Sequence, residues 1–115
     1  MSITRIESGK RMSQAVAHGS LVFLAGQVAP DPTPDVAGQT RQILGEIDRL
    51  LALAGTDKTR ILSATIYLTD IATFPEMNVV WDSWVPQGHL PARATVEANL
   101  AAAVYKVEIQ VVAAR

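Results

Sequence analysis

Two apolar segments that need cover on both sides constrain this chain more than any other feature. Residues 21–25 (LVFLA) carry no polar side chain, and residues 61–68 (ILSATIYL) are broken only by small polar groups. A strand with one wet face alternates apolar and polar residues, so unbroken apolar runs of this length predict strands that are buried on both faces. The fold must therefore provide cover for two sides of a sheet.

Two amphipathic helices are predicted as cover. Between residues 36 and 54, apolar side chains recur every three or four positions and form one stripe. Asp35 is suited to cap the start of this helix, and Gly55 is suited to end it. A second helix is predicted after residues 73–76 (TFPE), which read as a capping box with proline in the first turn. Its apolar face comprises Phe74, Met77, Trp81 and Trp84.

The remaining segments predict short strands around these helices. The predicted strands are 3–8, two strands within 14–27 around a turn at 18–20, 60–68, 92–98 and 104–112, and the proline-rich residues 28–35 form a loop. The resulting order is ββ(β)-α-β-α-β-β, which is typical of a two-layer α+β sandwich with a mixed sheet. At 115 residues the chain is one domain, 1–115.

One face of this sheet is left without cover. Both helices are needed on one side, and no further element remains for the other. A monomer would expose a large apolar patch there, so we expect the chain to associate with copies of itself through the open face. A closed symmetric homo-oligomer is the usual result.

Composition excludes several classes of function. The net charge of −1 and the absence of a basic run give no electrostatic support for nucleic-acid binding. There is no cysteine, which excludes disulfides, thiol catalysis and thiolate metal sites. The only histidines, His18 and His89, lie far apart in sequence, so no metal site is predicted. The N-terminus lacks the apolar core of a signal peptide and no run approaches membrane-spanning length, so we expect a cytoplasmic protein.

An arginine and a glutamate in the last two predicted strands are the candidates for chemistry. Arg93 has the planar donor fork that suits a small carboxylate, and Glu108 is suited to hold or activate a water molecule. Antiparallel pairing of these strands would let both side chains point to one face. The alternative is that Arg93 and Glu97 or Glu108 simply form an interfacial ion pair. Backbone N–H groups near Gly26 are a weaker candidate, because a plain turn also explains this position.

The C-terminal segment also resembles a known family. Residues 91–114 (PARATVEANLAAAVYKVEIQVVAA) closely resemble the C-terminal signature of the RidA family, also called the YjgF/YER057c/UK114 or L-PSP endoribonuclease family. Residues 24–28 (LAGQV), 35–44 (DVAGQTRQIL) and 62–81 (LSATIYLTDIATFPEMNVVW) are similar to that family as well. The resemblance therefore covers nearly the whole chain.

This resemblance implies a chorismate-mutase-like fold and a homotrimer with sites in the clefts between subunits. The implied activity is hydrolysis of reactive 2-imino acids or their enamine tautomers, such as 2-iminopropanoate and 2-iminobutanoate, to 2-oxo acids and ammonia. Arg93 matches the family's carboxylate-binding arginine, and Glu108 matches its water-positioning glutamate. Backbone groups near Thr95 and Gly26 would help to position the substrate. No cofactor and no metal is required, because the imine is already electrophilic.

Three positions of the implied pocket depart from the family's well-studied deaminases. Thr95 replaces a cysteine, Met12 replaces a tyrosine, and Ala25 replaces a serine before the Gly-Gln pair. Carboxylate binding is therefore better supported than imine hydrolysis. Two alternatives stay open: a non-catalytic module that binds small carboxylates, and an L-PSP-type endoribonuclease or translation inhibitor, against which the near-neutral charge argues.

Overall fold

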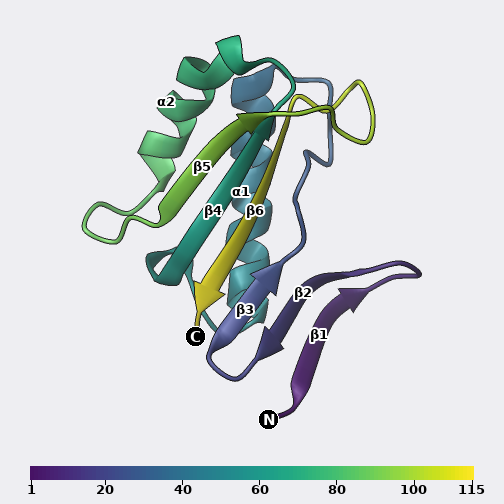
Figure 1. The fold of residues 1–115 in the computed structure, drawn as a ribbon, viewed down its shortest axis with the longest axis vertical. Coiled ribbons are helices and arrows are strands. Elements are labelled where there is room, and N and C mark those ends of the chain that lie inside the picture. The colour runs from purple at the N-terminus through teal and green to yellow at the C-terminus, as the bar shows by residue number, and fades with distance from the viewer.

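The protein is a two-layer α+β sandwich, with two helices packed on one face of a six-stranded sheet (Figure 1). The computed structural model describes residues 1–115. The strands are β1 (Ile3–Ser8), β2 (Ser13–His18), β3 (Leu21–Leu24), β4 (Ile61–Leu68), β5 (Ala92–Glu97) and β6 (Val107–Ala114). Each predicted strand is present, although the last one begins at Val107 rather than at residue 104. The predicted fold class and element order are confirmed.

The two helices begin and end where local chemistry directs them. Helix α1 (Val36–Leu53) starts behind Asp35, whose carboxylate accepts a hydrogen bond from the Gly38 N–H at 3.0 Å. Its chain direction changes at Gly55, whose φ of 81° lies in the left-handed region that glycine tolerates. Neither helix combines the length and apolarity needed to cross a bilayer.

Helix α2 (Phe74–Trp84) starts differently from the prediction. The capping box at residues 73–76 is wrong, because the Thr73 side chain makes no capping bond to the helix. Its hydroxyl instead donates to the Asp70 carbonyl oxygen at 2.6 Å. A short 3₁₀ turn, η2 (Ile71–Thr73), precedes the helix, and the Asp70 carboxylate caps that turn at the Ala72 N–H. A second such turn, η1 (Lys58–Arg60), precedes β4.

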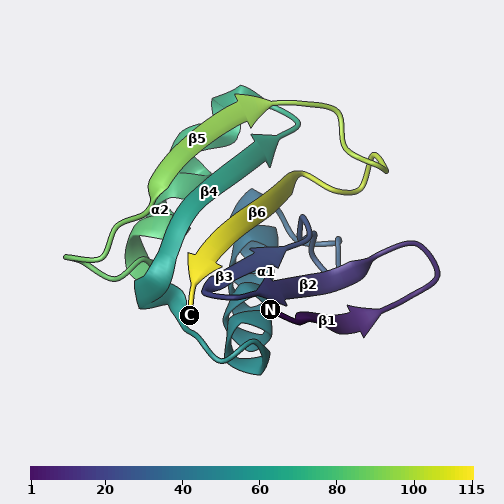
Figure 2. The same ribbon diagram turned by 60° about the horizontal axis from the view of Figure 1, so that its bottom comes forward.

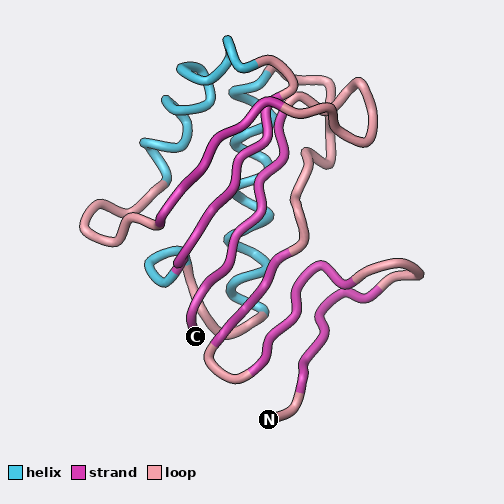
Figure 3. Tube along the Cα trace, in the orientation of Figure 1, coloured by secondary structure: helices cyan, strands magenta, loops and turns pink.

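The order of strands across the sheet is β1-β2-β3-β6-β4-β5. All neighbours are antiparallel except β4 and β5, which run parallel because α2 connects them as a crossover. The antiparallel pairing that would let Arg93 and Glu108 point to one face does not occur, because β4 lies between β5 and β6. Figure 3 shows the long loop that carries the chain from the edge strand β5 back to β6.

The core lies between the sheet and the helices. Alternate residues of the central strands point into it, such as Ile66 on β4 and Ile109 on β6, both fully buried. Helix α1 contributes Ile43, Ile47 and Leu50 to the same cluster. Figure 2 shows that both helices lie behind one face of the curved sheet.

The other face of the sheet is uncovered, as the apolar runs predicted. In β3, Val22 and Leu24 are buried, whereas Leu21 and Phe23 are 39% and 46% exposed. Val96 on β5 is 41% exposed. A single chain thus leaves large apolar side chains in water on the face opposite the helices, which we call the open face.

The N-terminal hairpin β1–β2 is fastened to α1 by an ion pair. Alternation would direct Glu7 to the open face, since its neighbour Ile6 packs against the core. Glu7 instead has a φ of 53°, and its carboxylate accepts two hydrogen bonds from Arg49 of α1, one of them 3.1 Å long. Arg49 also contacts Glu46 at 2.8 Å. The hydrogen bonds from Arg49 hold the pKa of Glu7 below its usual range.

Candidate functional site

Arg93 is held by helix α2 in a geometry that leaves donors free. Its Nη1 donates to the Oδ1 atom of Asn78 at 2.9 Å. The guanidinium carbon lies 5.5 Å from the ring centre of Phe74 and 5.2 Å from that of Trp81. A cation at this distance from an aromatic face is attracted by about 0.5–1 kcal/mol per ring. One neutral hydrogen bond and two rings thus orient the arginine.

The helical spacing of its partners explains this arrangement. Phe74, Asn78 and Trp81 are residues i, i+4 and i+7 of α2, so they lie on one stripe of the helix. That stripe faces the edge strand β5, where Arg93 points toward the helices. An aromatic, an amide and an aromatic side chain therefore follow one another beneath the guanidinium.

No carboxylate neutralises Arg93 within the chain. Both ion pairs of the protein belong to Arg49. Glu97 accepts a hydrogen bond from the Ile71 N–H at 2.9 Å instead of approaching Arg93. Arg93 therefore forms no ion pair inside one protomer. A half-buried guanidinium with a neutral partner and free donors is arranged for an anion from elsewhere.

Thr95 lies two residues further along β5 and points to the same side as Arg93. Its Oγ1 is buried and has no hydrogen-bond partner. An unpaired buried hydroxyl costs about 1–3 kcal/mol, so its position next to Arg93 marks this end of β5 as incomplete. We call Arg93, Asn78 and Thr95 the arginine half-site.

Glu108 projects from β6 to the open face. Its neighbours Val107 and Ile109 are fully buried in the core, so alternation directs Glu108 away from the helices. Its register partner on β4 is Tyr67. The Glu108 carboxylate lies against Gly26: a Cβ atom on that glycine would lie 2.2 Å from Oε2. The absence of a side chain at Gly26 is what allows this position of the carboxylate.

The other predicted pocket residues lie near Gly26. Met12 and Gly26 line one cavity of about 390 Å³ between the N-terminal hairpin, the segment after β3 and helix α1. Ala25 is next to Gly26 in the chain, and its carbonyl oxygen accepts a hydrogen bond from the Gln27 side chain at 3.0 Å. The Gln27 N–H donates to the Ile109 carbonyl oxygen at 2.8 Å, which fixes this segment beside β6. We call Glu108, Gly26, Ala25 and Met12 the glutamate half-site.

Arg93 and Glu108, the charged residues of the two half-sites, point to opposite faces of the sheet. The expectation that Arg93 and Glu108 share a face is wrong within a single chain, because β4 separates their strands and the two side chains point in opposite directions. The structure therefore groups the predicted residues into two sets and does not join them. No group of three His, Asp or Glu side chains is gathered as a metal ion would require.

Sequence reasoning missed the role of Asn78 and of the two rings. Phe74 and Trp81 were placed on the apolar face of the second helix, and Asn78 was considered only as a residue that could cap the helix or bridge subunits, so none of them was connected with Arg93. The spacing of these residues places them on one stripe of α2. That stripe indicates a contact with Arg93 only once β5 is known to pack beside the helix. Parallel pairing of β5 with β4 is the tertiary fact that was not visible in the sequence.

Comparison with known proteins identifies the family. A family model described as endoribonuclease L-PSP matches residues 2–115. The chain belongs to this family. A RutC family protein of Haemophilus ducreyi is 46% identical over 112 residues, which cover 97% of this chain and 96% of the relative. The family resemblance predicted from the C-terminal signature is confirmed.

Solved structures of the L-PSP family share the fold over the whole length. NMB1025 of Neisseria meningitidis, a member of the YjgF protein family, is 44% identical with a TM-score of 0.97, covering 100% of this chain and 96% of that one. Rv2704 of Mycobacterium tuberculosis, a member of the YjgF/YER057c/UK114 family, is 31% identical with a TM-score of 0.89, covering 99% and 100%.

Proposed function

We propose that this protein hydrolyses small 2-imino acids, or their enamine tautomers, to 2-oxo acids and ammonia. The observation that carries the proposal is the Arg93 guanidinium, which is oriented by Asn78 and two rings and has no anionic partner. Family membership supports the same reaction, since the RidA signature containing Arg93 and Glu108 implies it.

In this proposal Arg93 binds the substrate carboxylate. The Nη1 atom is engaged by Asn78, and the other donors of the fork remain for the two carboxylate oxygens. Fixing the carboxylate places the adjacent C2 atom, which carries the imine, at a defined distance from the protein. Asn78 acts as a positioning residue, because it contacts the arginine and not the substrate.

Glu108 supplies the water. Its carboxylate accepts a proton from a water molecule while the oxygen of that water bonds to C2, and the C=N bond becomes a single bond. Glu108 returns that proton to the nitrogen, which gives a carbinolamine with OH and NH₂ on C2. The carbinolamine hydroxyl then loses its proton and the nitrogen gains one, so that the C=O bond forms as the C–N bond breaks, giving the 2-oxo acid and ammonia. One water is consumed, and no electrons are exchanged, so the reaction needs no redox partner.

Joining the two half-sites requires two copies of the chain. Arg93 faces the helices at the edge of the sheet and Glu108 faces the open side, so one chain cannot present both to one small molecule. The apolar open face favours association, and the family resemblance implies a homotrimer. We therefore place the complete site between the arginine half-site of one subunit and the glutamate half-site of another.

An imine hydrolysis assay tests the proposal. An amino acid oxidase generates 2-iminopropanoate from alanine, and formation of the 2-oxo acid is followed with and without the protein. We expect Arg93→Gln to lower kcat/KM at least about 30-fold, because a charged hydrogen-bonded contact worth about 2 kcal/mol is lost. The exposed Arg11→Gln variant is the matched control and should behave as wild type. Equal rates for wild type and Arg93→Gln would refute the proposal.

A second candidate is a module that binds small carboxylates without turnover. The arginine half-site alone favours it, because it needs neither Glu108 nor a second copy. Binding of 2-oxobutanoate that depends on Arg93, together with no acceleration of imine hydrolysis by wild type, would select this alternative. The description of the family model as an endoribonuclease suggests RNA cleavage, but the net charge of −1 does not favour it.

A further inference from the structure

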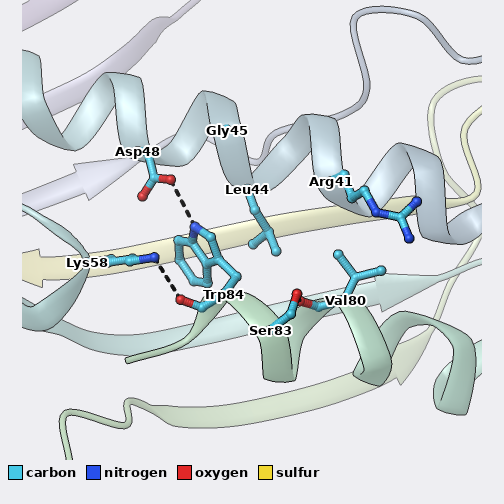
Figure 4. Close-up of a pocket in the computed structure, with 8 residues that line it drawn as sticks. All are labelled: Arg41, Leu44, Gly45, Asp48, Lys58, Val80, Ser83 and Trp84. Atoms are coloured by element: carbon cyan, nitrogen blue, oxygen red, sulfur yellow. Dashed lines mark hydrogen bonds between the residues drawn. The ribbon is translucent and has the colours of Figure 1, made fainter. Parts of the chain in front are cut away.

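A groove between α1 and α2 lies on the helical layer, on the side of the molecule away from the open face. It encloses about 320 Å³, which is in the range of pockets that hold small molecules. Figure 4 shows Arg41 at one end of the groove and Asp48 with Lys58 at the other. Its main lining residues are Arg41, Leu44, Gly45, Lys58, Val80 and Trp84. None of them belongs to either half-site.

Gly45 makes the groove deep, and nothing else in the structure requires a glycine there. It lies in the interior of α1, where glycine costs about 1 kcal/mol relative to alanine. Its φ is not positive, and a Cβ atom on it would find nothing within 4 Å. Neither backbone geometry nor packing therefore explains why residue 45 is a glycine. A glycine here leaves space for a ligand against the helix backbone.

Some charged groups of the groove have partners within the protein, and Arg41 has no ion-pair partner. The Asp48 carboxylate accepts from the indole Nε1 of Trp84 at 2.9 Å, and Lys58 donates to the Trp84 carbonyl oxygen at 2.8 Å. Lys58 also lies 5.1 Å from the centre of the Trp84 ring. Arg41 is exposed and takes part in no ion pair. With two cations against one anion, the groove is complementary to a ligand that carries one negative charge.

The floor between these ends is apolar. Leu44 and Val80 are 2% and 5% exposed and form the base beside the Gly45 backbone, and the half-buried Trp84 ring closes one side. A ligand here needs a compact apolar body to cover this floor and an anionic group to reach Arg41. Position 41 is one helical turn before Gly45, and the Arg41 side chain lines the end of the groove opposite Asp48 and Lys58 (Figure 4).

We propose that this groove binds small amphipathic monocarboxylates, with the carboxylate on Arg41 and the apolar body over Gly45 against Leu44, Val80 and Trp84. This site is separate from the proposed catalytic site and does not depend on it. Two probes represent the class, 4-methylpentanoate and 3-phenylpropanoate. The neutral amide of the first probe keeps the apolar body without the charge.

Nuclear magnetic resonance can report on this site directly. The protein has two tryptophans, so its ¹⁵N spectrum contains two indole signals, and Trp81→Phe assigns the one from Trp84. Titration with 4-methylpentanoate should shift the Trp84 indole signal and the amides of residues 44–48. The neutral amide should bind about fivefold more weakly, which is the size of an exposed ion pair.

Three variants separate this groove from the carboxylate site at Arg93. Arg41→Gln should weaken 4-methylpentanoate binding about fivefold, Gly45→Leu should abolish the shift of Trp84, and Arg93→Gln should leave it unchanged. Arg11→Gln is the charge control, and circular dichroism with a thermal melt checks that each variant is folded. The inference is overturned by equal affinity of wild type and Arg41→Gln, by equal binding of acid and amide, or by loss of the Trp84 shift in Arg93→Gln.

Discussion

At the scale of single residues, Gly26 determines where the Glu108 carboxylate lies. A Cβ atom at position 26 would meet the Glu108 side chain at 2.2 Å from Oε2 and 2.9 Å from Cδ. The atoms in its way are the end of a flexible side chain and not backbone. A larger residue would therefore move the carboxylate at little cost to the fold.

We predict that Gly26→Ala lowers kcat/KM for 2-iminopropanoate about 10-fold or more, because a displaced carboxylate no longer orients water toward C2. The Kd for 2-oxobutanoate should change less than about twofold, since Arg93 is untouched. Gly9→Ala is the matched control, because its added methyl group would have no neighbour closer than 3.8 Å. A variant that retains full activity with a displaced Glu108 would show that this carboxylate does not act on water.

Residue chemistry was predictable from the sequence where one residue type has a narrow use. Arg93 was identified because a guanidinium within a short apolar strand needs an anion. The partner Asn78 was not, because an amide on a helix has many uses, and its orientation depends on how α2 packs beside β5. Local chemistry thus indicates which residue is unusual, and tertiary packing decides what it contacts.

At the scale of elements, helix α1 has Gly45 in its interior and is followed by Gly55, and only the second is required by the backbone conformation. Gly55 has a φ of 81°, whereas Gly45 lies in ordinary helical backbone with empty space around it. The same substitution should therefore have opposite effects at the two positions.

We predict that Gly45→Ala raises the free energy of unfolding by about 0.5–1 kcal/mol, because alanine restricts the unfolded chain and fits the helix. Gly55→Ala should lower it by about 1–2 kcal/mol, because a side chain is strained in the left-handed region. Urea titration followed by circular dichroism measures both values. A destabilising Gly45→Ala would mean that the helix needs the glycine for a structural reason that the contacts do not reveal.

Elements were the most predictable level. The apolar stripe, Asp35 and Gly55 correctly bracketed α1, because those signals depend on near neighbours in the chain. The start of α2 was predicted less well: Asp70 placed a 3₁₀ turn before the helix, and Thr73 bonds back to Asp70 instead of capping forward. Competing local hydrogen bonds are the reason, since two short polar side chains were available for the same turn.

At the scale of the whole molecule, the open face presents both protruding and recessed surface. Phe23 is exposed beside Val16 and Val112, its register partners on the neighbouring strands. A hollow of about 280 Å³ lies between β4 and β5, lined mainly by Ser63, Thr65, Ala92 and Ala94. Large side chains at one end of the face and small ones at the other suit packing against further copies of the chain.

We predict that Phe23→Glu converts the assembly to monomers, because a buried carboxylate without a partner is costly in an apolar interface. Size-exclusion chromatography with light scattering should give a trimer for wild type and a monomer for the variant, which should also lose imine hydrolysis. Val79→Glu on α2 is the matched control, since Val79 is 70% exposed on the helical layer. A trimeric, active Phe23→Glu protein would contradict this assignment of the interface.

The topology was where sequence reasoning failed. Antiparallel pairing of the last two strands was considered from the sequence, yet β4 separates β5 from β6. Residues 61–68 are apolar on both faces, which is consistent with a central strand, but no local pattern indicates which strands flank it. The uncovered face could be predicted without the strand order. Two strands are apolar on both sides, and the two helices can cover only one side of the sheet.

The placement of Arg93 and Glu108 on opposite faces has consequences for how activity depends on protein concentration and for complementation between inactive variants. Activity per chain would fall on dilution, because a dissociated monomer carries both residues but cannot bring them to the same substrate molecule. Two inactive variants, one without the Arg93 guanidinium and the other without the Glu108 carboxylate, would complement each other when co-expressed. In a mixed oligomer, some interfaces would combine the intact Arg93 of one subunit with the intact Glu108 of another.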